Sequence, residues 1–301
     1  MFEIPQLMPN DRAIIINADD FGITHSTNQA IVELFENDSI TSSSLMVPCT
    51  AAKEVPQLCS KNHNLKVGIH LTLTSTENYS LKPVFQEYNL ESLVTDEGFF
   101  PKDLTFVEKN ADPLHVKAEL EAQILWALSH GVDVTHLDSH AGSVMGLTTG
   151  RDFLEIVFDL CEKYELPFNL PLQIIDQPFL SRSQKSLFEQ RILSAKRRGI
   201  ELIDDLIPLP YHLDPGENYN HMRDGLIRQI EYCKPGITQI VAHPAKVTSE
   251  LQALTPHFKK RGLEFQLLND PRIKHTLQVN HIKLISWEYL RSLQRSKKPL
   301  Y

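Results

Sequence analysis

The chain has 301 residues, of which 42% are hydrophobic and 23% are charged, and its formal net charge is −8. This composition is that of an ordinary globular protein, the length permits one large domain or two small ones, and the acidic charge without a basic block argues weakly against nucleic-acid binding. No apolar run approaches the roughly 20 residues of a membrane span, and the four cysteines form no Cys-x-x-Cys pair. Residues 1–12 lack a basic segment followed by an apolar core, so we expect one cytoplasmic domain over residues 1–301 with no membrane or nucleic-acid partner.

Apolar, β-branched runs alternate along the chain with patterns of helical period. We expect strands at residues 13–17, 44–47, 66–73, 132–138, 200–203, 236–242 and 282–286. We expect helices at residues 26–37, 112–130, 151–164, 180–198, 218–233, 263–269 and 287–294, and an extended segment at 167–175. Repeated strand–helix alternation predicts an α/β fold with a parallel sheet, and seven or eight such units favour a closed or nearly closed barrel.

Two regions interrupt this alternation. Residues 74–112 contain no clear element, and residues 208–216 carry three prolines. A long irregular segment in a compact domain is usually a functional loop, so we interpret residues 74–112 as a substrate-covering loop. Phe99-Phe100 within this loop is predicted to be a packing pair rather than a sugar-stacking surface. The sequence leaves open whether Tyr211-His212 in the second region reaches a functional site.

Two adjacent carboxylates follow the first predicted strand, in Asn17-Ala18-Asp19-Asp20-Phe21-Gly22. We expect them where that strand ends and the chain turns, at the edge where parallel α/β sheets bind ligands. A pair of acids is costly there unless a cation, a proton or water compensates the charge, which suggests a metal or acid–base site. Taken alone, a solvated acidic turn with Gly22 opening the next helix is the simpler and favoured interpretation.

Histidines stand at the ends of three later strands. His70 interrupts an otherwise apolar strand, Val67-Gly68-Ile69-His70-Leu71-Thr72-Leu73-Thr74, and alone is better explained as a hydrogen-bonded core residue. In an extended segment His136, Asp138 and His140 share one face, and three polar groups there need a partner. His243 follows the sixth predicted strand, in Val-Ala-His-Pro-Ala, and is weak evidence by itself.

Taken together, the four motifs are more specific than any one of them. In a parallel barrel every strand presents its carboxyl end to the same rim, so we expect Asp19, Asp20, His70, His140 and His243 to meet. Two histidines and one carboxylate make a three-ligand metal site with an open position for water, which the metal makes nucleophilic near neutral pH. A second carboxylate can take a proton from that water, and a remote histidine can protonate a leaving group. These are the components of a metal-assisted hydrolase.

The motifs Asn-Ala-Asp-Asp-Phe-Gly, Gly-Ile-His-Leu-Thr-Leu-Thr, Thr-His-Leu-Asp-Ser-His and Ala-His-Pro-Ala occur in this order between residues 14 and 245. In motif and spacing the chain resembles the YdjC-like (ChbG-type) carbohydrate deacetylases. The resemblance implies a distorted TIM-like barrel of seven parallel strands and a divalent cation, described for this family as magnesium. It further implies removal of acetyl groups from N-acetylated sugars such as diacetylchitobiose, and a homodimer.

By position, the resemblance assigns Asp20, His70 and His140 to the metal. It assigns Asp19 to the general base on water and His243 to the acid for the departing amine, although the sequence leaves open which aspartate is base and which is ligand. Two imidazoles suit zinc, nickel, cobalt or manganese better than magnesium, so the metal is open too. Residues 141–146 are small and apolar where some relatives carry histidines, which puts the chitobiose specificity in question.

Two other functions are compatible with the same scaffold. A different metal hydrolase could cleave phosphoesters, although no Arg/Lys cluster or glycine-rich phosphate cradle accompanies the motifs. A saccharide-binding protein could keep the barrel without turnover, although both aspartates and the principal histidines are present. The deacetylase interpretation therefore leads, with a small acetylated saccharide as the partner.

Overall fold

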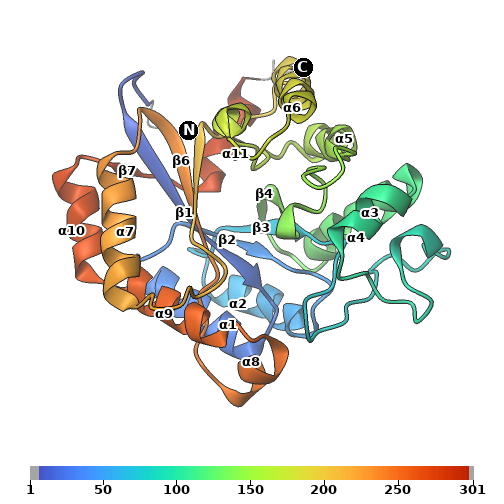
Figure 1. Ribbon diagram of the computed structural model, residues 1–301, viewed down its shortest axis with the longest axis horizontal. Helices are drawn as coiled ribbons and strands as arrows, with labels where there is room; N and C mark the ends of the chain where they lie inside the picture. The colour runs from blue at the N-terminus through green and yellow to red at the C-terminus, as the bar shows by residue number, and fades with distance from the viewer. Residues whose placement is uncertain (1–6, 298–301) are drawn as a thin grey trace.

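The computed structural model describes residues 7–297. Residues 1–12, in which the sequence shows no signal-peptide pattern, therefore lie partly outside the described residues. Within this range, a seven-stranded sheet forms the centre, every strand pair in it is parallel, and helices surround it (Figure 1). The predicted α/β class with a parallel sheet is confirmed. The strands are β1 (Arg12–Phe21), β2 (Ser42–Leu45), β3 (Val67–Leu71), β4 (Val134–Ser139), β5 (Asp205–Pro208), β6 (Gly236–Ala242) and β7 (Lys283–Leu284).

Strand β1 lies in the middle of the sheet and organises it. The strands follow the order β4-β3-β2-β1-β6-β5, and β7 pairs with the first part of β1. β7 and β2 therefore occupy successive stretches of one edge of β1, while β6 pairs along the other edge. The isoleucines at 14, 15 and 16 are buried, as expected of a parallel strand that is covered on both faces.

The continuous ladders leave a break between the outer strands β4 and β5. Isolated parallel bridges join Leu137 to Phe168 and Pro171 to Ile203 across this break. The extended segment predicted at residues 167–175 thus forms single bridges, and it ends in a 3₁₀ turn at Leu172–Asp176. The parallel sheet is confirmed, whereas a closed barrel is not, because no continuous ladder within the described residues joins β4 to β5.

Helices follow most of the strands, as the alternation predicts. The pattern misses α2, α3, α8 and α10, because 6 to 9 residues hold fewer than three turns of the helical period. In residues 7–297 no helix is both long and apolar enough to cross a membrane. The helices are α1 (His25–Glu36), α2 (Val55–Lys61), α3 (Leu104–Asn110), α4 (Pro113–Ser129), α5 (Leu154–Tyr164), α6 (Arg182–Arg197), α7 (Tyr219–Glu231), α8 (Ser249–Leu254), α9 (Phe258–Leu268), α10 (Pro271–Val279) and α11 (Trp287–Ser296).

The strand predicted at residues 200–203 is wrong in position, because the ladder of β5 begins at Asp205. Ile200 and Ile203 are buried and supply the apolar pattern. Their stretch of chain contacts its neighbours through isolated backbone bonds, such as the one that the N–H of Leu172 donates to the carbonyl of Ile203. The apolar pattern at residues 200–203 therefore reflects buried side chains rather than a strand.

Residues 74–112 are packed against the body of the protein. They include α3, and Leu90 and Phe100 within them are buried. Glu119 on α4 accepts hydrogen bonds from the backbone N–H groups of Val84 and the residue after it, which ties the middle of this segment to α4. The packing role predicted for Phe100 is confirmed, since only 1% of it is exposed.

Gly68 in β3 lies directly against the imidazole of His136. A methyl group at residue 68 would come within 2.2 Å of His136 Nδ1, and this ring is already stacked on Trp287 with ring centroids 4.7 Å apart. We expect Gly68→Ala to lower the free energy of unfolding by about 1–3 kcal/mol through overpacking. Urea denaturation measures this change.

The matched control is Gly225→Ala in the interior of α7, where an added methyl group meets no atom within 4 Å. Alanine favours helix over glycine by about 0.5–1 kcal/mol, so this variant is expected to be slightly more stable than wild type. Equal stability of Gly68→Ala and wild type would contradict the tight contact between β3 and His136.

Candidate active site

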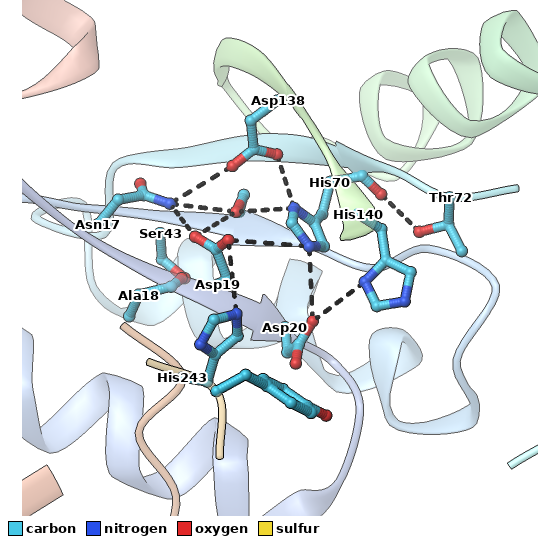
Figure 2. A network of polar contacts seen from close by, with 12 residues as sticks. Asn17, Ala18, Asp19, Asp20, Ser43, His70, Thr72, Asp138, His140 and His243 are labelled. Carbon is cyan, nitrogen blue, oxygen red and sulfur yellow. Dashed lines mark hydrogen bonds and ion pairs between the residues drawn. The ribbon is translucent and has the colours of Figure 1, made fainter. Parts of the chain in front are cut away.

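Asp19 and Asp20 lie at the carboxyl end of β1, but the strand does not stop before them. It continues through both residues to Phe21, and its register against β2 shifts between Ala18 and Phe21. In a regular strand neighbouring side chains point to opposite faces. Asp20 has a φ of +64°, a conformation that aspartate tolerates better than most residues. The predicted turn is thus a strand irregularity, which brings both carboxylates to one site (Figure 2).

His70 on β3 is oriented by Asp138 on the neighbouring strand β4. Its Nδ1 lies 2.8 Å from Asp138 Oδ1, which places the Nδ1 proton in that hydrogen bond. His70 Nε2 then faces the aspartates, 3.5 Å from Asp20 Oδ1 and 3.9 Å from Asp19 Oδ2. Burial lowers the pKa of His70, but the charges of Asp138, Asp19 and Asp20 outweigh burial and raise it to about 10.

The three residues predicted as metal ligands are brought together. His140 follows β4, and its Nδ1 lies 3.6 Å from the same Asp20 Oδ1 that faces His70. One ligand atom from each of Asp20, His70 and His140 lies within 4.8 Å of the others, so these residues could hold a metal ion. Asp20 Oδ1 is buried and accepts no hydrogen bond from any residue between 7 and 297, which is costly for a carboxylate unless a ligand is bound.

A second group could also hold a metal by distance alone, namely Asp19, His70 and Asp138. In this group the close contact between His70 and Asp138 is a hydrogen bond of 2.8 Å, so both atoms already have a partner. A carboxylate that receives the far N–H of a histidine is the usual arrangement behind a metal-ligating imidazole. The first group is therefore the better candidate.

Arg261 on α9 is a component of the site to which the sequence pattern gave no role. Its Nη2 donates to Asp20 Oδ2 at 2.6 Å and to the hydroxyl of Tyr211 at 3.1 Å. Burial raises the pKa of Asp20, but the Arg261 guanidinium together with the neighbouring His140 and His243 outweighs burial and holds this pKa well below its usual range. Asp20 therefore stays ionised, with one oxygen paired to Arg261 and the other directed to the two histidines.

Asp19 has a different environment from Asp20. Asn17 Nδ2 donates to Asp19 Oδ1 at 2.7 Å, while Asp19 Oδ2 lies 3.9 Å from both His70 Nε2 and His243 Nε2. Burial, with the nearby charges of Asp138 and Asp20, raises the pKa of Asp19 to about 8, although His70 opposes the shift. A carboxyl group with a raised pKa is suited to proton transfer near neutral pH.

His243 lies just after β6, beside Asp19 and opposite His70. Its backbone N–H donates to Glu264 Oε2 at 2.5 Å, and its ring meets the edge of Tyr211 with centroids 5.3 Å apart. Burial lowers the pKa of His243 to about 3, and the neighbouring Arg261 adds to the shift. The imidazole is therefore neutral at physiological pH.

His136 stands behind the ligand atoms rather than among them. Its Nε2 lies 3.8 Å from Asp138 Oδ2, and its ring stacks on Trp287. The predicted alternation along β4 is therefore correct for His136 and Asp138. His140 reaches the site differently, because the strand has ended and the chain turns at Ala141 with a φ of +51°.

Two cavities meet at this site. One has a volume of 370 Å³ and includes Asp19 in its wall; the other has a volume of 570 Å³ and includes Asp20 and His140. Both share Ala141, Pro208 and His243, so the shared wall lies beside the aspartates and histidines described above. The larger cavity is also lined by residues that begin the predicted covering loop and by the proline-rich region: Thr74, Ser75, Thr76, Glu77, Pro210 and Tyr211.

Known proteins are similar to this chain, two of them in sequence and one in its solved structure. A carbohydrate deacetylase from Thermus thermophilus is 30% identical over 285 residues, covering 93% of this chain and 94% of that protein. A carbohydrate deacetylase from Thermoanaerobacter pseudethanolicus is 28% identical over 278 residues, covering 92% of this chain and 99% of that protein. A crystal structure from Enterococcus faecalis, of a protein provisionally assigned to cellobiose-phosphate cleavage, has a TM-score of 0.75 at 25% identity and covers 93% of this chain and 99% of that one.

The family model described as YdjC-like protein matches residues 13–279. This range contains all the aspartates, histidines and the arginine of the candidate site. The relatives are matched over nearly their whole length, so the likeness extends beyond short motifs. The chain therefore belongs to the YdjC-like protein family.

Proposed function

We propose that this protein is a metal-dependent hydrolase that removes acetyl groups from N-acetylated sugars. The observation that carries the proposal is the buried Asp20 Oδ1, which accepts no hydrogen bond within the described residues and faces ring nitrogens of His70 and His140 at 3.5 and 3.6 Å, beside a separately held Asp19. The names of the curated relatives, which are carbohydrate deacetylases, support the choice of reaction and substrate. The two cavities at this point provide room for a substrate on either side.

The donor set fits a divalent metal. Asp20, His70 and His140 would hold the ion, with Asp138 fixing the ring of His70 from behind. Two imidazoles and one carboxylate favour zinc, manganese, cobalt or nickel, whereas the family resemblance favours magnesium. When bound, such an ion lowers the pKa of water and polarises a carbonyl oxygen.

Two residues beside the proposed metal ligands, Asp19 and His243, are each assigned one proton transfer of amide hydrolysis. Water adds to the acetyl carbon and the carbon–nitrogen bond breaks, giving acetate and a free amine, which needs one proton. We assign Asp19 to take the proton from the attacking water and His243 to deliver a proton to the leaving nitrogen. Because His243 is neutral at rest, its proton must come from within the cycle, and Asp19 Oδ2 is 3.9 Å away.

The scaffold that presents these groups is inferred to be a distorted barrel. The isolated bridges at Phe168 and Pro171 continue the sheet from β4 toward Ile203, just before β5. This arrangement supports the TIM-like barrel that the family resemblance implies, with residues 167–172 in place of a regular strand. Such a scaffold directs the ends of all its strands to one rim.

The direct test is acetate release after reconstitution with one metal at a time. The purified protein would be stripped with a chelator, reloaded with Zn²⁺, Mn²⁺, Co²⁺, Ni²⁺ or Mg²⁺, and assayed on N-acetylated mono- and oligosaccharides and on a phosphoester panel. We expect acetate from an acetylated sugar with at least one metal and none after stripping. Phosphate release without acetate would instead indicate a phosphoesterase, and sugar binding without any product would indicate a binding protein.

Metal binding is expected to depend on pH through His70. Its pKa of about 10 means that the metal-free protein carries a proton on this imidazole at pH 7, and a ligand nitrogen must be unprotonated. Each metal ion bound should therefore release about one proton, and Kd should fall about tenfold per pH unit between about pH 6 and 8. Calorimetry in two buffers of different ionisation enthalpy measures the released proton; a Kd that is independent of pH would contradict the assignment of His70.

A further inference from the structure

The smaller of the two cavities contains a polar atom that the proposed chemistry does not use. Asn169 lines this cavity of 370 Å³ together with Asp19 and His243, and its Oδ1 is buried without a hydrogen-bond partner in residues 7–297. A buried acceptor that lacks a partner costs about 1–3 kcal/mol. The carboxamide therefore needs a donor that the described protein does not provide.

Asn169 is held in place by the main chain around it. It lies on the segment that bridges β4, where its backbone N–H donates to the carbonyl of Leu137 at 3.1 Å. It thus stands at the same edge of the sheet as the aspartates and histidines. The rest of the cavity wall is mainly apolar and includes Met145, Leu147, Ile174, Phe179 and Leu206, although Ser139, Gln177 and Asp205 also line it.

A largely apolar wall that carries an unpaired acceptor at Asn169, besides the His243 Nδ1 atom that also lacks a partner among the described residues, matches the surface of a sugar ring. The C–H face of a pyranose packs against apolar side chains, and a ring hydroxyl donates a hydrogen bond to an acceptor. A saturated acyl chain would fill the apolar part but would leave Asn169 Oδ1 unpaired, at the same energetic cost as before. The cavity therefore favours a hydroxylated ring over an acyl chain.

The larger cavity carries unpaired hydroxyl groups of its own. Thr74 and Thr76 line it beside Asp20 and His140, and both Oγ1 atoms are buried without a partner among the described residues. Because the two cavities share His243 in their walls, a ligand that reacts there can occupy both. Polar groups on both sides of His243 indicate a ligand with hydrogen-bonding groups on both sides.

We propose that Asn169 is a specificity-determining residue, and that its cavity binds the sugar unit next to the unit whose acetamido group reacts. A hydroxyl of that neighbouring sugar donates to Asn169 Oδ1, and its apolar face packs on Met145, Leu147 and Phe179. This inference rests on the proposed deacetylase function for the identity of the ligand.

Binding to a slow variant separates this inference from the reaction itself. Metal-loaded Asp19→Asn protein would be titrated calorimetrically with N-acetylglucosamine, diacetylchitobiose and N-butyrylglucosamine, with and without Asn169→Leu. We expect Asn169→Leu to weaken the disaccharide about tenfold and to leave the two monosaccharides unchanged, since one neutral hydrogen bond is lost. Asn169→Asp keeps an acceptor oxygen and is expected to retain most of the affinity.

The control variant is Gln173→Ala, on the same segment but with its side chain directed to Lys234, which should bind all three sugars like the parent. Equal weakening of mono- and disaccharide by Asn169→Leu, or no effect, would overturn the inference, as would tighter binding of the N-butyryl sugar. Acetate release by the protein with Asp19 intact is measured in parallel. Acetate with no Asn169 effect refutes only this inference, whereas an Asn169 effect without acetate refutes only the proposed function.

Discussion

Replacing Asp19 by asparagine is expected to lower kcat for acetate release roughly 10²- to 10⁴-fold, the usual contribution of a general base, while the protein keeps its metal. The amide keeps an oxygen for the hydrogen bond from Asn17 Nδ2 but cannot accept a proton from water. KM for the acetylated sugar should change little, because Asp19 is assigned to proton transfer rather than to substrate binding. Steady-state kinetics and elemental analysis of the same preparation measure both effects.

The companion variant is Asp20→Asn, which is expected to lose metal and activity together. Asp20 Oδ1 is the carboxylate oxygen that faces both histidines, and a neutral amide is a weaker ligand for a divalent cation. Adding excess metal should restore part of the activity of Asp20→Asn and none of that of Asp19→Asn. If the two variants behave alike, the division of the pair into ligand and base fails, even if acetate release itself is confirmed.

Arg261→Met is expected to lower the free energy of unfolding of the metal-free protein by about 3–5 kcal/mol, because it leaves the buried carboxylate of Asp20 without its cation. Methionine keeps most of the apolar volume of the side chain, so the change reports mainly on charge. Lys163→Met, which removes an exposed partner of Glu121, is the control and should cost under about 1 kcal/mol. Urea denaturation in the presence of a chelator measures both variants.

The stability that the ion pair between Asp20 and Arg261 contributes should depend on pH in a definite direction. The pKa of Asp20 is depressed below its ordinary value of 3.8, so the ion pair with Arg261 stabilises the folded protein above that pH and loses its effect on acidification. The stability difference between wild type and Arg261→Met should therefore shrink as the pH falls below about 4. A double variant, Asp20→Asn with Arg261→Met, should recover part of the lost stability. A constant difference at all pH values would show that Arg261 stabilises the fold by packing instead.

Part of the site could be predicted because parallel strands share a carboxyl edge. Asp20, His70 and His140 follow or end three different strands, and the topology alone places them together. The orientation of the two adjacent aspartates could not be predicted in this way. It depends on the positive φ of Asp20 and the register shift in β1, and no local pattern in the sequence signals either.

Arg261 illustrates a second limit. It lies 241 residues after Asp20 and is buried in a helix whose sequence gives no sign of an inward charge. The homodimer, the covering role of residues 74–112 and the metal identity stay predictions.

Prediction of the fold succeeded where the periodicity was long or strict. The range 236–242 coincides with β6, and the long pattern at 112–130 contains α4. It failed at residues 200–203, where buried isoleucines imitate a strand, and between β4 and β5, where isolated bridges replace a ladder. The hydrophobic pattern of a sequence indicates which residues are buried. Burial alone does not determine which backbone N–H and C=O groups form the hydrogen bonds of a strand ladder.

Anomalous X-ray diffraction from crystals of the zinc- or manganese-loaded protein, recorded at the absorption edge of the metal, tests the central claim most directly. The account predicts one ion with Asp20 Oδ1, His70 Nε2 and His140 Nδ1 as ligands at about 2.0–2.2 Å, and Asp19 close by but unbound. An ion held instead by Asp19 and Asp138, or no ion at this edge of the sheet, would contradict it.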